Sequence, residues 1–99
     1  MKKKTDKEKI EYQRHQFIRR WFLVARCQAK MRGQVWNLTW DDFYRLWSED
    51  DRWMNRGRAK ENYCMCRTDM DGDWEISNIE MTTRSEMLKR ESVHNRRKI

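Results

Sequence analysis

The stretch from Asn62 to Arg90 limits the possible folds of this chain most strongly, because each part of it contains a clear local signal. Residues 63–67, YCMCR, alternate in a pattern that predicts a short strand with both cysteines on one face. Residues 69–73, DMDGD, have the composition of a tight turn. A second strand over residues 74–81 and a helix from about Arg84 complete the predicted unit.

The turn and the start of this helix can be predicted in more detail. Gly72 is available wherever the turn needs a positive φ angle, since glycine adopts that conformation at little cost. Thr83 followed by Glu86 fits a capping box, which predicts that the helix begins just after Thr83. The return strand is expected to switch its buried face at a kink near Ser77 and Asn78. Its candidate residues are Trp74, Ile76, Ile79 and Met81.

The composition indicates a small core. Only 37% of the 99 residues are hydrophobic and 39% are charged. Six Trp and three Phe concentrate the apolar area in large rings, which bury about 150–250 Å² each. This length suits one domain over residues 1–99, and a chain without proline and with three glycines has little that resembles an inter-domain linker.

The N-terminal half has a helical pattern. Residues 1–9 form a Lys-rich lead that we expect to be flexible, and residues 10–48 form the helical part. A long helix is predicted from about Ile10 to Met31, where apolar side chains recur at three- and four-residue spacing. Thr39 is a suitable N-cap for a second, short helix over residues 40–48. Together with the C-terminal unit, these elements predict a small α+β domain.

The excess of positive charge suggests a polyanionic partner. The formal net charge is +7 and the sequence pI is about 9.6, which is typical of nucleic-acid-binding domains, although it also fits a basic protein that is merely soluble. Trp53 lies in a basic segment and could stack on a base or anchor the core. The candidate phosphate contacts are Arg52, Arg56, Arg58, Lys60, Arg67, Arg84, Arg90, Arg96 and Arg97.

The cysteines and the hydropathy pattern bear on location. Three Cys is an odd count, and with no signal-peptide pattern ahead of them we expect a reducing, cytoplasmic location. Cys64 and Cys66 have no second pair at zinc-finger spacing, so burial is favoured over zinc binding. The longest apolar run, residues 21–25, is too short to cross a bilayer, and we expect no membrane partner.

The C-terminal unit resembles a known nuclease finger. Arg67, Asp69, Gly72, Trp74 and Asn78 follow a run similar to R-x-D-x-x-G-x-Y/W-x-x-x-N, and NIEMTTRSEM continues it with a strand, a cap and a helix. The chain is similar here to the ββα-metal finger of HNH (His-Me finger) nucleases, especially small HNH-like proteins of bacteriophages. The upstream NLTWDDFYRLW also resembles the short helix before many such fingers, so the similarity covers roughly residues 36–90. It implies an HNH-like finger with a basic tail over residues 62–95 and, for a phage protein, the cytoplasm of a bacterial host.

The family's catalytic side chains are replaced in this chain. By resemblance, the general-base position falls on Arg67, the neighbouring metal ligand on Cys66 and the helix ligand on Met87, while the structural Asn78 is kept. Arginine stays protonated and cannot accept a proton from water at neutral pH. A thiol and a thioether are soft ligands that match Mg²⁺ poorly. The resemblance therefore favours a finger that binds nucleic acid, DNA rather than RNA, without catalysis and without a cofactor.

Two alternatives remain open. The chain could be an active DNA endonuclease of nicking or homing type, with Asp69, Asp71 and Asp73 holding Mg²⁺ or Mn²⁺ and Arg67 clamping the phosphate. A hydrogen-bonded turn is the simpler explanation of those carboxylates. The chain could also be a phage inhibitor that binds a host nucleic-acid-processing protein, for which an exposed Trp-rich face would be a sign.

Overall fold

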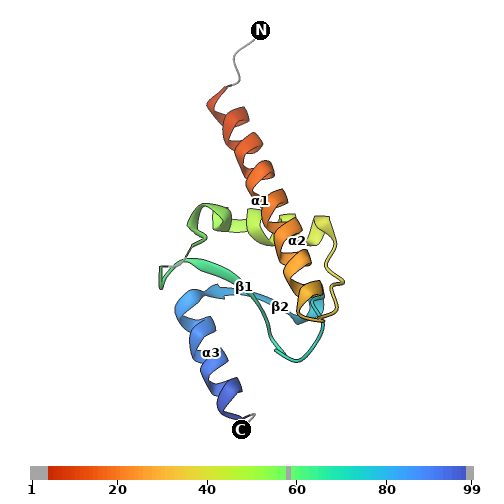
Figure 1. The fold of residues 1–99 in the computed structure, drawn as a ribbon. Helices are drawn as coiled ribbons and strands as arrows, with labels where there is room; N and C mark the ends of the chain where they lie inside the picture. Colours follow the sequence, from red (N-terminus) through yellow and green to blue (C-terminus); the bar gives the residue numbers. More distant parts are fainter. Residues whose placement is uncertain (1–4, 58, 98–99) are drawn as a thin grey trace.

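The fold joins a helical part to a strand–strand–helix unit (Figure 1). The computed structural model describes residues 5–57 and 59–97, with side chains up to residue 94. The described elements are α1 (Asp6–Met31), α2 (Trp40–Ser48), the 3₁₀ helix η1 (Glu49–Asn55), β1 (Tyr63–Arg67), the 3₁₀ helix η2 (Ile76–Asn78), β2 (Ile79–Thr83) and α3 (Arg84–Arg97). The predicted α+β class is therefore confirmed.

Helix α1 begins earlier than the apolar periodicity predicts. The Thr5 hydroxyl accepts a hydrogen bond from the Glu8 amide at 3.2 Å. Asp6 and Glu8 lie in the first turn, where the positive end of the helix dipole stabilises negative charge. Residues 6–9 thus belong to the helix rather than to a flexible lead, and residues 1–4 lie outside the described residues. The helix ends before Gly33, whose φ of 72° is easily adopted by glycine.

Helix α2 has the predicted bounds and the predicted cap. The Thr39 hydroxyl accepts a hydrogen bond from the Asp42 amide at 3.1 Å. Leu38, just before the cap, and Phe43, in the first turn, are both buried, as a hydrophobic staple requires. The local sequence was sufficient to place this helix.

The core consists mainly of aromatic rings between the helices and the sheet. Ile18 of α1, Phe43 and Trp47 of α2 and Trp53 of η1 form its buried centre. The half-buried hydrophobics packed against this centre are Trp21, Phe22, Ala25, Trp36, Trp40, Tyr44, Tyr63, Met65 and Met81. Trp53 is therefore a core anchor, and stacking on a base is not available to it.

The two strands pair antiparallel, with Met65 opposite Met81 at the centre of the register. Met65 and Met81 face the aromatic core. Cys66 lies on the other face of β1, where it is 6% exposed and adjacent to Arg90 of α3. The sheet thus separates the aromatic core from α3.

The return strand is shorter than predicted. It begins at Ile79, because Ile76 to Asn78 turn into η2. Trp74 pairs instead with the segment between α1 and α2: its amide donates to the Val35 carbonyl at 2.9 Å, and its carbonyl accepts from the Asn37 amide at 2.7 Å. Trp74 and Ile76 are therefore wrongly placed in the return strand by the sequence pattern.

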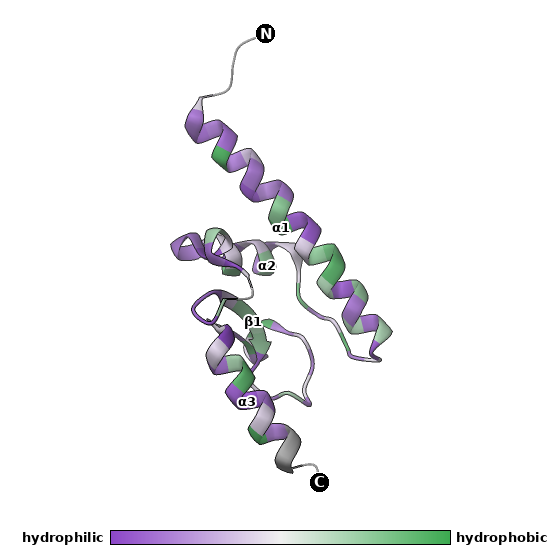
Figure 2. Ribbon diagram, turned by 60° about the vertical axis from the view of Figure 1, so that its left-hand side comes forward, coloured by the Kyte–Doolittle hydropathy of each residue, from purple (hydrophilic) through white to green (hydrophobic). Residues whose placement is uncertain are grey.

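The molecule is elongated, with extents of 60 × 26 × 21 Å, and the free ends of α1 and α3 lie at opposite ends of the long axis (Figure 1). Figure 2 shows that the first turns of α1, which project beyond the rest, are mostly hydrophilic, while hydrophobic residues gather in its second half.

Candidate nucleic-acid interface

Asn78 closes the acidic turn between the strands. Its side-chain amide donates to the carbonyls of Asp69 and Asp73, each at 3.0 Å, and its side-chain oxygen accepts from the Asp69 amide at 2.8 Å. Its own carbonyl accepts from the Thr68 amide at 2.9 Å. One side chain therefore fixes both ends of the turn.

Gly72 is required in this turn by close packing. Its φ is not in the positive range, so the turn does not use the conformational freedom of this glycine. A Cβ atom on Gly72 would lie 2.8 Å from the Asn78 side-chain nitrogen and 3.3 Å from the Asp69 carbonyl oxygen. The absence of a side chain lets Asn78 reach its partners.

Arg67 lies at the end of β1 and is held against the same turn. Its Nη1 donates to the Gly72 carbonyl at 2.8 Å, and its guanidinium lies over the Trp74 ring, 4.9 Å from the ring centroid. Trp74 is fixed in turn by a 2.9 Å hydrogen bond from its Nε1 to Gln34. The guanidinium is thus positioned by two contacts, yet it remains only half-buried.

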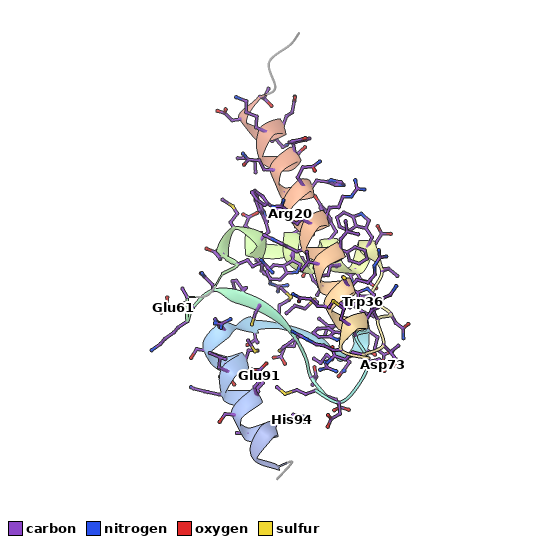
Figure 3. All side chains as sticks on the ribbon, in the orientation of Figure 1. Arg20, Trp36, Glu61, Asp73, Glu91 and His94 are labelled. Carbon is purple, nitrogen blue, oxygen red and sulfur yellow. The ribbon has the colours of Figure 1, made fainter. Side chains whose placement is uncertain are left out.

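An open groove of about 940 Å³ runs beside β1. All five residues of β1 line it and none of β2 does, so it follows the unpaired edge of that strand. Four arginines line the groove, against two carboxylates, Asp71 and Glu91. The arginines are Arg32, Arg56, Arg67 and Arg84. Figure 3 shows Glu91 and His94 on α3, and Trp36 and Asp73 where the turn meets the segment after α1.

Arg56 lies over a second aromatic pair in this groove. Its guanidinium is 4.4 Å from the centroid of Trp21 and 5.6 Å from that of Trp47. Desolvation against these rings lowers the pKa of Arg56, although an arginine keeps its charge at neutral pH. Arg56 and Arg67 therefore present two cationic groups, each backed by tryptophan.

Three of the candidate phosphate contacts, Arg56, Arg67 and Arg84, are brought together in the groove. Arg32, at the C-cap of α1, also lines it and was missed, because the sequence gives no sign that α1 ends beside β1. Lys60 is exposed but is not among the lining residues. Arg58 lies outside the described residues, as do the side chains of Arg96 and Arg97.

Two further candidates are bound within the protein. Arg52 donates to the Leu46 carbonyl at 3.0 Å and pairs with Glu49 and Asp50 at 3.7 and 3.9 Å. Arg90 forms a two-pronged pair with Glu80 and a 3.7 Å pair with Glu86. Contact of Arg52 and Arg90 with phosphate stays a prediction. Such contact would require each arginine to exchange its carboxylate partners for the phosphate.

The two positions that the resemblance assigns to metal ligands, Cys66 and Met87, do not suit a hard cation. Cys66 is buried, and desolvation raises the pKa of its thiol, so it stays protonated at neutral pH. Met87 is half-buried on the groove wall and offers only a thioether. Neither side chain is a ligand that Mg²⁺ or Mn²⁺ prefers.

The acidic turn likewise brings no set of ligands together. An Asp69 carboxylate oxygen accepts from the Asp71 amide at 3.1 Å, and Asp71 lies 3.4 Å from His94 Nε2. Asp73 is exposed and engages Asn78 through its carbonyl. Within residues 5–57 and 59–94, no three His, Cys, Asp or Glu side chains are arranged to hold a metal.

Comparison of the chain with protein-family models, with curated proteins and with solved structures found no match. Among the described helices, none is both long enough and apolar enough to cross a membrane.

Proposed function

We propose that this protein binds nucleic acid through the arginine-lined groove, on an HNH-like finger that no longer catalyses hydrolysis. The observation that supports binding best is the convergence of Arg32, Arg56, Arg67 and Arg84 on one groove in a chain of net charge +7. Arginines that share a groove raise the local positive potential and suit phosphate oxygens. DNA is the favoured partner, and by resemblance the protein acts in the cytoplasm of a phage-infected bacterium.

The likeness to an HNH finger rests on the order and closure of residues 62–90. Two antiparallel strands are followed by a helix, and Asn78 closes the turn between the strands as the structural asparagine of that family does. Loss of catalysis is supported by Arg67 at the general-base position, because its guanidinium is permanently charged and already bonded to Gly72.

The alternative of a phage inhibitor that binds a host protein gains no support from the tryptophans. All six lie in the described chain, and each is buried or half-buried, so no Trp-rich face is exposed.

Binding can be tested by fluorescence anisotropy with labelled DNA over a range of salt concentrations. We expect affinity to fall steeply between about 50 and 200 mM salt, because binding releases counterions from several phosphates. Arg84→Ala should weaken binding about three- to tenfold and lower the salt slope by about one. Arg19→Ala removes the same charge from an exposed site on α1 outside the groove and should leave both quantities unchanged.

A flat salt response, or equal losses in both variants, would contradict binding in the groove. Loss of catalysis has its own test: supercoiled plasmid incubated with Mg²⁺ or Mn²⁺ should remain intact. Nicking that disappears in Asp69→Ala and Asp71→Ala would instead identify an active nuclease.

A further inference from the structure

The two arginines that lie on tryptophans offer more than charge. Arg67 lies over Trp74 and Arg56 over Trp21, with the guanidinium carbons 4.9 and 4.4 Å from the ring centroids. A guanidinium is planar, so a group resting on a ring on one side can receive a second flat group on its other side. Both arginines line the same groove.

Single-stranded nucleic acid offers flat groups, its bases, together with negative charge, its phosphates. In a duplex each base is already stacked on its neighbours, and only the base edges are open in the grooves. In a single strand the bases can separate and stack on aromatic rings or on arginine planes. The groove has the volume of a small-ligand pocket, about 940 Å³, which suits a few splayed bases rather than a duplex cylinder.

We infer that the groove binds single-stranded nucleic acid, with unpaired bases stacked on Arg56 and Arg67 and phosphates held by Arg32 and Arg84. This inference rests on the proposed function and specifies the form of its ligand. Bases and phosphates are common to DNA and RNA, so the stacking argument applies to both. Arg56 and Arg67 rest on tryptophan rings before binding, and Arg67 is also held by its hydrogen bond to Gly72, which lowers the cost of ordering them.

The test compares four labelled ligands of one length at one salt concentration. They are a DNA strand, the RNA strand of the same sequence, the DNA duplex, and a DNA strand with abasic sites at its central positions. We expect either single strand to bind at least about tenfold tighter than the duplex. Removing two central bases should reduce the affinity of the DNA strand about tenfold or more, while every phosphate is kept.

Protein variants separate stacking from charge. Arg56→Lys keeps a positive charge but loses the plane, so it should weaken binding of the intact strand several-fold and leave the abasic strand unaffected. Arg19→Lys, the same exchange outside the groove, should change neither. Circular dichroism of each variant verifies the fold, and the abasic comparison uses the unaltered protein.

Each outcome decides a separate point. Duplex binding equal to or tighter than that of both single strands overturns the inference and leaves the proposed function standing. Equal affinity for the intact and abasic strands also overturns it, because phosphates alone would then account for binding. Absence of binding to all four ligands overturns the proposed function itself.

Discussion

At the scale of single residues, Asn78 organises the loop from which Arg67 and Trp74 are positioned. Its three side-chain hydrogen bonds satisfy backbone groups at both ends of the turn, and they depend on the missing Cβ of Gly72. A hydrogen bond of this kind contributes about 1 kcal/mol net to stability. The loop therefore owes much of its shape to one amide.

Replacing this amide should destabilise the protein. We expect Asn78→Ala to lower the free energy of unfolding by about 2 kcal/mol, since two carbonyls and one amide each lose a hydrogen bond. Urea denaturation followed by circular dichroism measures the change. Ser77→Ala, next to it on the exposed side, loses only one hydrogen bond to Glu75 and should stay within about 0.5 kcal/mol of the parent protein. Equal urea midpoints for the two variants would show that the hydrogen bonds of Asn78 do not stabilise the fold.

Residue patterns could predict the turn, its asparagine and the arginines, but not which arginines remain available. The pairing of Arg52 with Glu49 and of Arg90 with Glu80 depends on side-chain directions that composition does not contain. Arg32 is assigned to the groove only once the end of α1 is placed against the rest of the chain.

At the scale of secondary structure, helices that begin at a capping residue could be predicted from the sequence, whereas pairing between distant segments could not. Both Thr39 and Thr83 cap their helices as expected, with Oγ accepting amides at 3.1 and 3.3 Å. The start of β2 was misplaced because Trp74 bonds to residues far from it in sequence, across the 34–37 segment. Pairing over that distance has no local signature.

The contact between β2 and α3 should depend on pH. Hydrogen bonding from Arg90 lowers the pKa of Glu80 below its usual value. A lowered carboxyl pKa stabilises the folded state above the ordinary glutamate pKa of about 4.3, and this stabilisation is lost as the pH falls through the lowered value.

We therefore expect Glu80→Gln to be less stable than the parent protein at pH 6, with the difference shrinking by about pH 3. Urea midpoints across this range measure it. Glu61→Gln, at an exposed position, should show no such pH dependence. A difference between Glu80→Gln and the parent that stays constant with pH would mean that the pair with Arg90 is not the source of stability.

At the scale of the whole molecule, contacts with the rest of the protein are unevenly distributed along α1. The buried side chains of this helix are Ile18 and Ala29, and the bond from Arg14 Nε to the Tyr44 hydroxyl, at 3.1 Å, lies before them. The first turns of α1 project from the body (Figure 1). In proteins a helix gains most of its stability from packing its apolar face on the rest of the molecule.

Hydrogen exchange followed by mass spectrometry should reveal this gradient. We expect amides of residues 9–11 to exchange much faster than those of residues 24–29, although all are helical, because Ala25 packs on the core and Ala29 is buried. Uniform protection along α1 would show that the projecting turns are stabilised by another contact. Exchange on addition of single-stranded DNA would also show whether these turns take part in binding.

The bridge between Trp36 and Trp74 also restricts how this chain can vary in length. The main chain of Trp74 is hydrogen-bonded to the residues on both sides of Trp36, Val35 and Asn37. Side chains alternate along an extended segment, so one added or deleted residue beside Trp36 would turn its indole away from the core. We therefore expect homologous sequences to keep a constant number of residues between Gly33 and Thr39, even where the identities of those residues drift.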